Sequence, residues 1–159
     1  MPAHAMAGRL AGMKPHVVIS SSQKTLRVPR KRIAELAELA ARAEGVRLSE
    51  LDVAVVGDAD MAAHNRRWMR HAGVTDVISF DLSSGERRGL CIQLIVCGPE
   101  AVRQARLHGE TPTRELLRYV AHGLLHQMGY EDQSIRGAAK MHAREDELLA
   151  ALRKAPMKQ

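Results

Sequence analysis

Two histidines four residues apart are the part of the chain best suited to chemistry. In the segment His122-Gly-Leu-Leu-His126, the spacing puts both imidazoles on one face of a helix, one turn apart, so that both can reach one metal ion. Gly129 lets the chain turn after this helix, and Asp132 follows where its carboxylate can come back over the pair. Two imidazoles and a carboxylate suit zinc, with a fourth position left open. The pattern therefore predicts one Zn2+ per chain, held by His122, His126 and Asp132.

Neighbouring residues leave alternatives open at this site. The same pattern is compatible with two exposed histidines on a solvated helix face and an aspartate in a turn. Glu115, two turns before His122 on the same face, is interpreted either as an acceptor for an imidazole N–H or as a solvated carboxylate in the first turn. His142 is a reserve ligand or a surface residue. Zinc peptidases of this pattern carry glutamate after the first histidine, whereas this chain has Gly123, which argues against a standard metalloprotease.

The helix that must position the histidines is predicted over residues 113–128. Thr111 and Pro112 supply a cap and a first-turn proline, and Gly129 supplies a C-terminal stop. At about 100° per residue, the apolar side chains form one stripe, and the histidines point almost to the opposite side. This stripe consists of Leu116, Leu117, Val120, Ala121, Leu124 and Leu125. Histidines that merely filled the core would fall within the stripe, so their placement favours a functional face.

The rest of the chain predicts one α+β domain over residues 16–155, a small mixed sheet flanked by helices. Short β-branched or apolar runs predict strands at 16–20, 51–56, 77–81 and 90–97, and helical periodicity predicts helices at 29–44, 100–107 and 134–152. Asp58 or Asp60 is expected to cap a further helix running towards Arg70. Residues 1–15 are small, basic and unpatterned, and are interpreted as a disordered N-terminal arm.

The composition favours a protein that binds a polyanion and excludes a membrane-spanning chain. The chain has 159 residues, a net charge of +6 and a pI near 9.8, which favours a polyanionic partner such as RNA. Hydrophobic residues make up 45%, and no apolar run approaches the ~20 residues of a membrane span. The two cysteines, Cys91 and Cys97, are interpreted as buried thiols in a reducing compartment. The sequence begins without an apolar signal segment, so we expect a cytoplasmic protein with no membrane partner.

A cluster of basic residues lies before the strand predicted at 77–81. Arg66, Arg67 and Arg70 lie around Trp68, and guanidinium groups suit bidentate contact with phosphate. Trp68 could stack on a base, but a buried tryptophan in the core is the favoured interpretation. The arginines could equally form a solvated helix face.

Together these motifs resemble the YbeY-type rRNA maturation endoribonucleases. The resemblance covers roughly residues 51 to 152, and its segments agree with that family in order and spacing. They are Asn65-Arg-Arg-Trp68, Thr75-Asp76-Val77-Ile78-Ser79-Phe80, Glu115-Leu116, the segment from His122 to Tyr130, and Met141 with Glu145. The resemblance implies an α+β fold and a zinc-dependent hydrolase that acts on single-stranded RNA. It further implies a role in 16S rRNA 3′-end processing and ribosome quality control, with the ribosome or its small subunit as partner.

Three positions depart from the family pattern. Asp132 stands where the family usually has a third histidine, and a carboxylate is a competent zinc ligand. Met69 stands where the family has an arginine, and Ile92-Gln93 replaces a Gly-Asp pair. These departures motivate a second hypothesis, an RNA- or ribosome-binding protein on the same fold that keeps a structural metal and has lost turnover.

The first hypothesis carries a mechanism. Zinc on His122, His126 and Asp132 would lower the pKa of a bound water towards ~7 and supply the hydroxide that attacks a phosphorus of the RNA backbone. Arg70 or Arg67 is expected to stabilise the charge that develops on the phosphoryl oxygens. No residue is assigned as the general acid, although Tyr130 lies at the edge of the predicted site.

Overall fold

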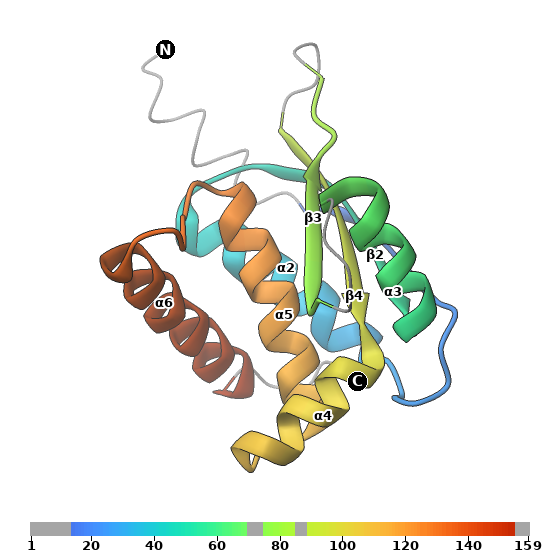
Figure 1. The fold of residues 1–159 in the computed structure, drawn as a ribbon. Helices are drawn as coiled ribbons and strands as arrows, with labels where there is room; N and C mark the ends of the chain where they lie inside the picture. The colour runs from blue at the N-terminus through green and yellow to red at the C-terminus, as the bar shows by residue number, and fades with distance from the viewer. Residues whose placement is uncertain (1–13, 70–74, 85–88, 155–159) are drawn as a thin grey trace, which may run out of the picture.

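The computed structural model describes residues 14–69, 75–84 and 89–154. Within them, one sheet of four strands has the order β1-β2-β4-β3. Strands β1, β2 and β4 run parallel to one another, while β3 pairs antiparallel with β4 and forms an edge of the sheet (Figure 1). The strand bounds are β1 His16–Ser21, β2 Leu48–Val56, β3 Val77–Asp81 and β4 Leu90–Cys97.

Helices cover both faces of this sheet. Helices α2 and α5 pack on one face with α6 outside them, and α3 covers the other face (Figure 1). The helices are α2 Arg30–Glu44, α3 Asp58–His64, α4 Gly98–His108, α5 Pro112–Gln127 and α6 Ile135–Lys154, with a π-helical turn η1 at Asn65–Met69. The α+β class, the mixed sheet and the flanking helices are as the sequence predicts. None of the helices within the described ranges is long and apolar enough to cross a membrane.

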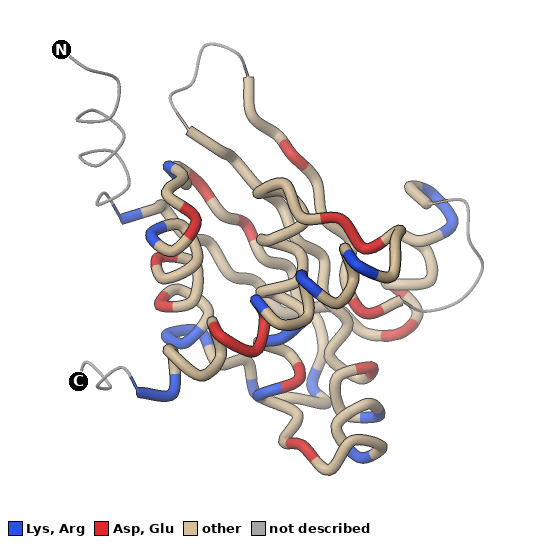
Figure 2. Tube along the Cα trace, turned by 90° about the vertical axis from the view of Figure 1, so that its left-hand side faces the viewer, with Lys and Arg blue, Asp and Glu red and all other residues tan. Residues whose placement is uncertain are grey.

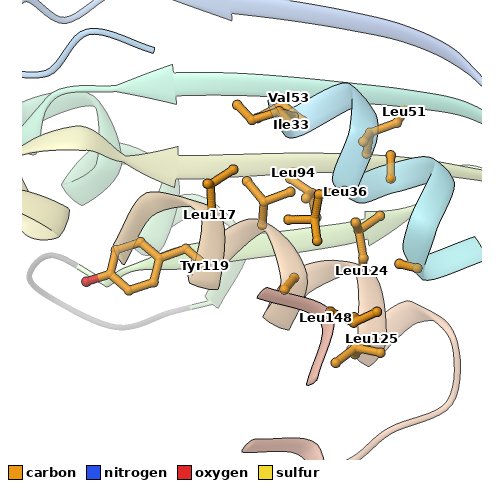
Figure 3. Packing of buried hydrophobic residues seen from close by; sticks show 14 of the residues in the cluster. Ile33, Leu36, Leu51, Val53, Leu94, Leu117, Tyr119, Leu124, Leu125 and Leu148 are labelled. Carbon is orange, nitrogen blue, oxygen red and sulfur yellow. The ribbon is translucent and has the colours of Figure 1, made fainter. Parts of the chain in front are cut away.

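The main core lies between the sheet and the helix pair α2 and α5. All six apolar side chains of the predicted α5 stripe are buried. Figure 3 shows Leu117 and Leu124 on the side of α2 and the sheet, and Leu125 beside Leu148 of α6. Thr111 caps α5 as expected, since its side chain accepts a hydrogen bond from the Arg114 amide at 3.2 Å. Burial of this stripe fixes the rotation of α5 and therefore the direction in which its histidine face points.

Gly123 lets α5 approach the sheet closely. A Cβ built on this residue would lie 2.6 Å from Leu94 Cδ2 and 3.3 Å from Val77 Cγ2. The position after the first histidine therefore faces β4 and β3, not the histidine face. The glutamate that zinc peptidases carry there has no room in this fold, which gives the sequence argument against a metalloprotease a steric basis.

Two local expectations need correction, and others fall outside the described residues. Neither Asp58 nor Asp60 caps α3. Its N-cap is Gly57 without a side-chain hydrogen bond, because the Asp58 carboxylate instead accepts hydrogen bonds from Arg103 of α4. Cys91 and Cys97 are buried free thiols, as expected. The helix expected to run towards Arg70 ends at His64 and continues as η1, and Arg70 and most of the expected N-terminal arm lie outside the described ranges.

We predict that Gly123→Ala destabilises the fold by roughly 1–3 kcal/mol, the usual range for overpacking a close-packed interior. The free energy of unfolding from urea titration measures this loss. Gly57→Ala is the control, because nothing lies within 4 Å of the Cβ it adds. Equal stability of Gly123→Ala and the wild type would show that α5 can move away from the sheet without cost.

Candidate metal centre

A cleft of about 630 Å³ runs along the histidine face of α5. Its walls come from α4, α5, α6 and the residues just before β3. Five carboxyl side chains line it, together with one arginine and three histidines. They are Asp76, Glu100, Glu115, Asp132 and Glu145, then Arg118, and His108, His122 and His142. The cleft is therefore richer in carboxylates than the basic chain as a whole.

His122 is held from both sides within this cleft. Its Nδ1 lies 2.7 Å from Oε2 of Glu145, a buried carboxylate of α6. Its Nε2 lies 3.5 Å from Oδ2 of Asp132, which is 45% exposed. A carboxylate on one ring nitrogen fixes the orientation and tautomer of a metal-binding imidazole and leaves the other nitrogen as the ligand. The Glu145 contact thus presents Nε2 of His122 to Asp132 and the open cleft.

The distance between His122 and Asp132 suits a zinc ion. Nitrogen and oxygen ligands lie about 2.0–2.2 Å from zinc, so two ligands at tetrahedral angles are separated by roughly 3.4 Å. The observed separation is 3.5 Å. Two of the three predicted ligands are therefore spaced as a tetrahedral site requires.

The third predicted ligand is not gathered with them. His126 lies one turn further along α5 and is exposed. Among residues 14–69, 75–84 and 89–154, no three histidine, cysteine or carboxylate side chains are arranged to hold a metal ion. His142, the reserve ligand, is 66% exposed, and its Nδ1 lies 3.5 Å from Oε1 of Glu145.

The loop that carries Asp132 is anchored at both ends. Gly129 adopts φ +109°, a left-handed conformation that a glycine accepts without strain. The Tyr130 hydroxyl then donates to the Glu44 carboxylate of α2 at 3.0 Å, and Arg144 of α6 donates to the same carboxylate at 2.6 Å. Glu131 accepts hydrogen bonds from the Ser134 amide and hydroxyl at the start of α6. These contacts fix where the chain leaves α5 and enters α6, with Asp132 between the two anchors.

Burial and neighbouring charges favour protonated groups in the cleft. The hydrogen bond that His122 donates to the Glu145 carboxylate is the main cause that raises the pKa of His122, and the nearby Asp76 and Asp132 carboxylates raise it further. Burial raises the pKa of Asp76, although its Oδ1 accepts a hydrogen bond from the Val77 amide at 2.7 Å. Along the Cα trace, Lys and Arg are interspersed with Asp and Glu in the helices (Figure 2). The excess of negative charge inside the cleft is a local feature that would favour a bound cation.

Three residues of this cleft were not assigned roles by spacing in the sequence. Glu145 and Asp76 entered only as members of motifs in the family resemblance, because their partners lie on other elements. No motif or spacing in the sequence indicated a role for Arg118. It pairs with Asp146 at 2.8 Å and lies 3.6 Å from Glu145, so it ties α5 to α6 beside His122.

Three residues that were given roles from the sequence have different surroundings in the structure. Glu115 is buried and lines the cleft, but Glu145 is the carboxylate that contacts the His122 imidazole. The expectation of a buried Trp68 is wrong, because the side chain is 50% exposed. Arg67 does not line the cleft; its guanidinium carbon lies 4.8 Å from the centre of the Trp68 ring.

The fold and this cleft define a class of protein, an α+β domain with a histidine pair on the helix beside an edge strand. Comparison with known proteins identifies the family. The family model described as Endoribonuclease YbeY matches residues 18–153. The chain belongs to the YbeY endoribonuclease family.

Curated relatives and a solved structure agree with this assignment. The chain is 35% identical over 127 residues to the Endoribonuclease YbeY of Macrococcus caseolyticus, covering 75% of this chain and 82% of that protein. It is 38% identical over 104 residues to the Anaeromyxobacter protein of the same name, covering 65% of this chain but only 54% of the relative. A solution structure of TM1509 from Thermotoga maritima superposes with a TM-score of 0.57 at 22% identity, covering 90% of this chain and 99% of the other. That likeness shows the fold.

The Glu145 contact predicts how the stability of the metal-free protein depends on pH. The folded protein binds a proton at His122 more tightly than the unfolded chain, where the imidazole pKa is near 6.5. Protonation of His122 therefore stabilises the fold, and this contribution is lost as the pH rises through the raised pKa. In Glu145→Gln, the free energy of unfolding should fall less than in the wild type between about pH 6 and 8.

Urea titrations of chelator-treated protein across that range measure the effect. His142→Gln is the control, because this exposed histidine also faces Glu145 and its replacement should leave the pH dependence of the wild type. The same pH slope in Glu145→Gln and the wild type would contradict the assignment of Glu145 as the main partner of His122.

Proposed function

We propose that this protein is a zinc-dependent endoribonuclease that cleaves single-stranded RNA. The observation that carries the proposal is the arrangement of His122, which has a buried carboxylate on Nδ1 and a second carboxylate facing Nε2. Membership of a family of endoribonucleases supports RNA as the substrate. We further propose a role in 16S rRNA 3′-end maturation and ribosome quality control in the cytoplasm, with the ribosome or its small subunit as partner.

His122, His126 and Asp132 are the residues that would hold the metal. The donor chemistry fits zinc, and the spacing of the first and last fits a tetrahedral site. Inclusion of His126 requires its exposed side chain to turn towards them, since it lies on the same face of α5, one turn away. When bound, zinc would supply a Lewis acid that lowers the pKa of water and makes a nucleophile available near neutral pH.

The residues of this chain have distinct tasks in the proposed reaction. Glu145 orients His122 and keeps its Nε2 directed at the cleft. Asp76 lines the same cleft, and burial raises the pKa of its carboxyl group above the usual value. Among the described residues, Arg118 is the arginine that lines the cleft. Its pairing with Asp146 and Glu145 reduces the positive charge available to a phosphate. The earlier assignment of this task to Arg70 or Arg67 remains a prediction.

Two observations favour a second candidate function. The described residues do not gather three metal ligands, and Arg67 lies on the Trp68 ring, away from the cleft lining. An RNA- or ribosome-binding protein that keeps this fold and a structural metal, without turnover, is compatible with both facts.

Metal content tests the proposed ligand set. We expect about one zinc per chain in the purified wild type by elemental mass spectrometry, and a strong loss in His122→Ala, His126→Ala and Asp132→Ala. His64→Ala is the matched control, because His64 lies on α3 across the sheet. Full zinc occupancy in His126→Ala would remove that residue from the site.

Cleavage of a labelled single-stranded RNA separates the two functions. We expect the rate to fall in His122→Ala by more than roughly 100-fold, the upper range for loss of a residue that only supports a ligand. His64→Ala should cleave at the wild-type rate. RNA binding without cleavage by zinc-loaded wild type would favour the second function, and equal cleavage by His122→Ala would indicate a contaminating nuclease.

A further inference from the structure

Trp68 is exposed in a way that demands an explanation. It is the single tryptophan of the chain, and half of its side chain faces solvent. Tryptophan is among the most costly side chains to leave in water, since its burial contributes a large apolar area. The next residue, Met69, is also 49% exposed. An exposed aromatic and its apolar neighbour on one turn, η1, mark a surface that a partner can cover.

The indole is held in place rather than loosely displayed. Phe80 of β3 meets it edge to face, with ring centres 5.5 Å apart and an angle of 75° between the planes. The Arg67 guanidinium lies 4.8 Å from the indole centre. Among the described residues Arg67 is exposed and forms no ion pair, so this planar cation is free to leave the ring. The ring surface thus already accepts a flat group and has a charge beside it.

Trp68 and the candidate metal centre lie on opposite sides of the edge strand β3, close enough for one ligand to reach both. Asp76 lines the cleft, and Phe80 lies four residues further along the same chain segment, so the two are at most about 13 Å apart in an extended strand. Val77 faces α5, whereas Phe80 packs with the cluster on the α3 side. Because β3 is an edge strand, a flexible ligand can pass over it from the cleft to the indole.

We propose that Trp68, supported by Phe80 and flanked by Arg66 and Arg67, is a stacking subsite for one unpaired base of single-stranded RNA. A stacked base covers the exposed indole, and the displaced Arg67 guanidinium meets the adjoining phosphate. Unpaired bases are required, since a duplex does not present a base face to a side chain. This inference rests on the proposed function for the identity of the ligand, and it adds a residue that selects single strands.

The fluorescence of Trp68 provides a direct readout, because no other residue contributes tryptophan emission. We expect a single-stranded RNA oligonucleotide of mixed sequence to quench this emission on binding, in His122→Ala protein and in chelator-treated wild type, neither of which should cleave it. A duplex of the same sequence, and heparin as a polyanion without bases, should leave the emission nearly unchanged. Equal quenching by heparin would overturn the stacking proposal in favour of a charge effect at Arg67.

Affinity for labelled single-stranded RNA gives the second readout. Trp68→Ala should weaken binding by about 5- to 150-fold, the range for loss of one base–aromatic stack, and Trp68→Phe should restore part of it. Val18→Ala is the control and should bind nearly as the wild type does, because Val18 is similarly exposed, at 47%, but lies on β1 at the opposite edge of the sheet. In cleavage assays, Trp68→Ala should raise KM and leave kcat little changed.

The two proposals fail in different ways. Unchanged RNA affinity in Trp68→Ala, with cleavage retained, would overturn the stacking subsite and leave the endoribonuclease intact. Quenching by single-stranded RNA without any cleavage by zinc-loaded wild type would support the subsite and overturn the enzymatic proposal. Binding of a ribosomal protein that buries Trp68 while RNA leaves its emission unchanged would assign the surface to a protein partner and overturn the subsite.

Discussion

The close packing of α5 against the sheet is the constraint on which the other features depend. Gly123 allows the helix to lie on Leu94 and Val77, and the buried leucine stripe on either side of it fixes the rotation of the helix. With the rotation fixed, His122 and His126 must face away from the core. A side chain at position 123 would have to displace the side chains of Leu94 and Val77 on two strands, so the direction of the histidine face is set by packing rather than by polar contacts.

That packing alone does not orient an imidazole, and α6 supplies what is missing. Glu145 contacts Nδ1 of His122, while Arg118 joins α5 to α6 beside it. The Tyr130 and Arg144 contacts to Glu44 secure the intervening loop to α2. The three helices are thus joined by two sets of polar contacts next to the core. The first set directs His122 Nε2 towards the cleft, and the second fixes the path of the loop that carries Asp132.

Much of this could be predicted from the sequence because it follows from local periodicity. The extent of α5, its buried stripe and the Thr111 cap all follow from patterns a few residues long. Three features could not, because each depends on how distant elements meet. Asp58 accepts hydrogen bonds from Arg103, 45 residues away, instead of capping its own helix. Glu145 finds His122 across 23 residues, and the exposure of Trp68 depends on where η1 meets the edge strand.

The charge of the cleft is opposite to that of the basic chain as a whole. Five carboxyl side chains line the walls, and a phosphate that approaches them as they stand is repelled. Burial is the main cause that raises the pKa of Asp76, and the hydrogen bond to Glu145 is the main cause that raises the pKa of His122. A divalent cation in the cleft would reduce the repulsion between the carboxylates and a phosphate. Under the proposed function, metal binding and RNA binding at this cleft would therefore be coupled, since the carboxylates that attract a cation repel a phosphate.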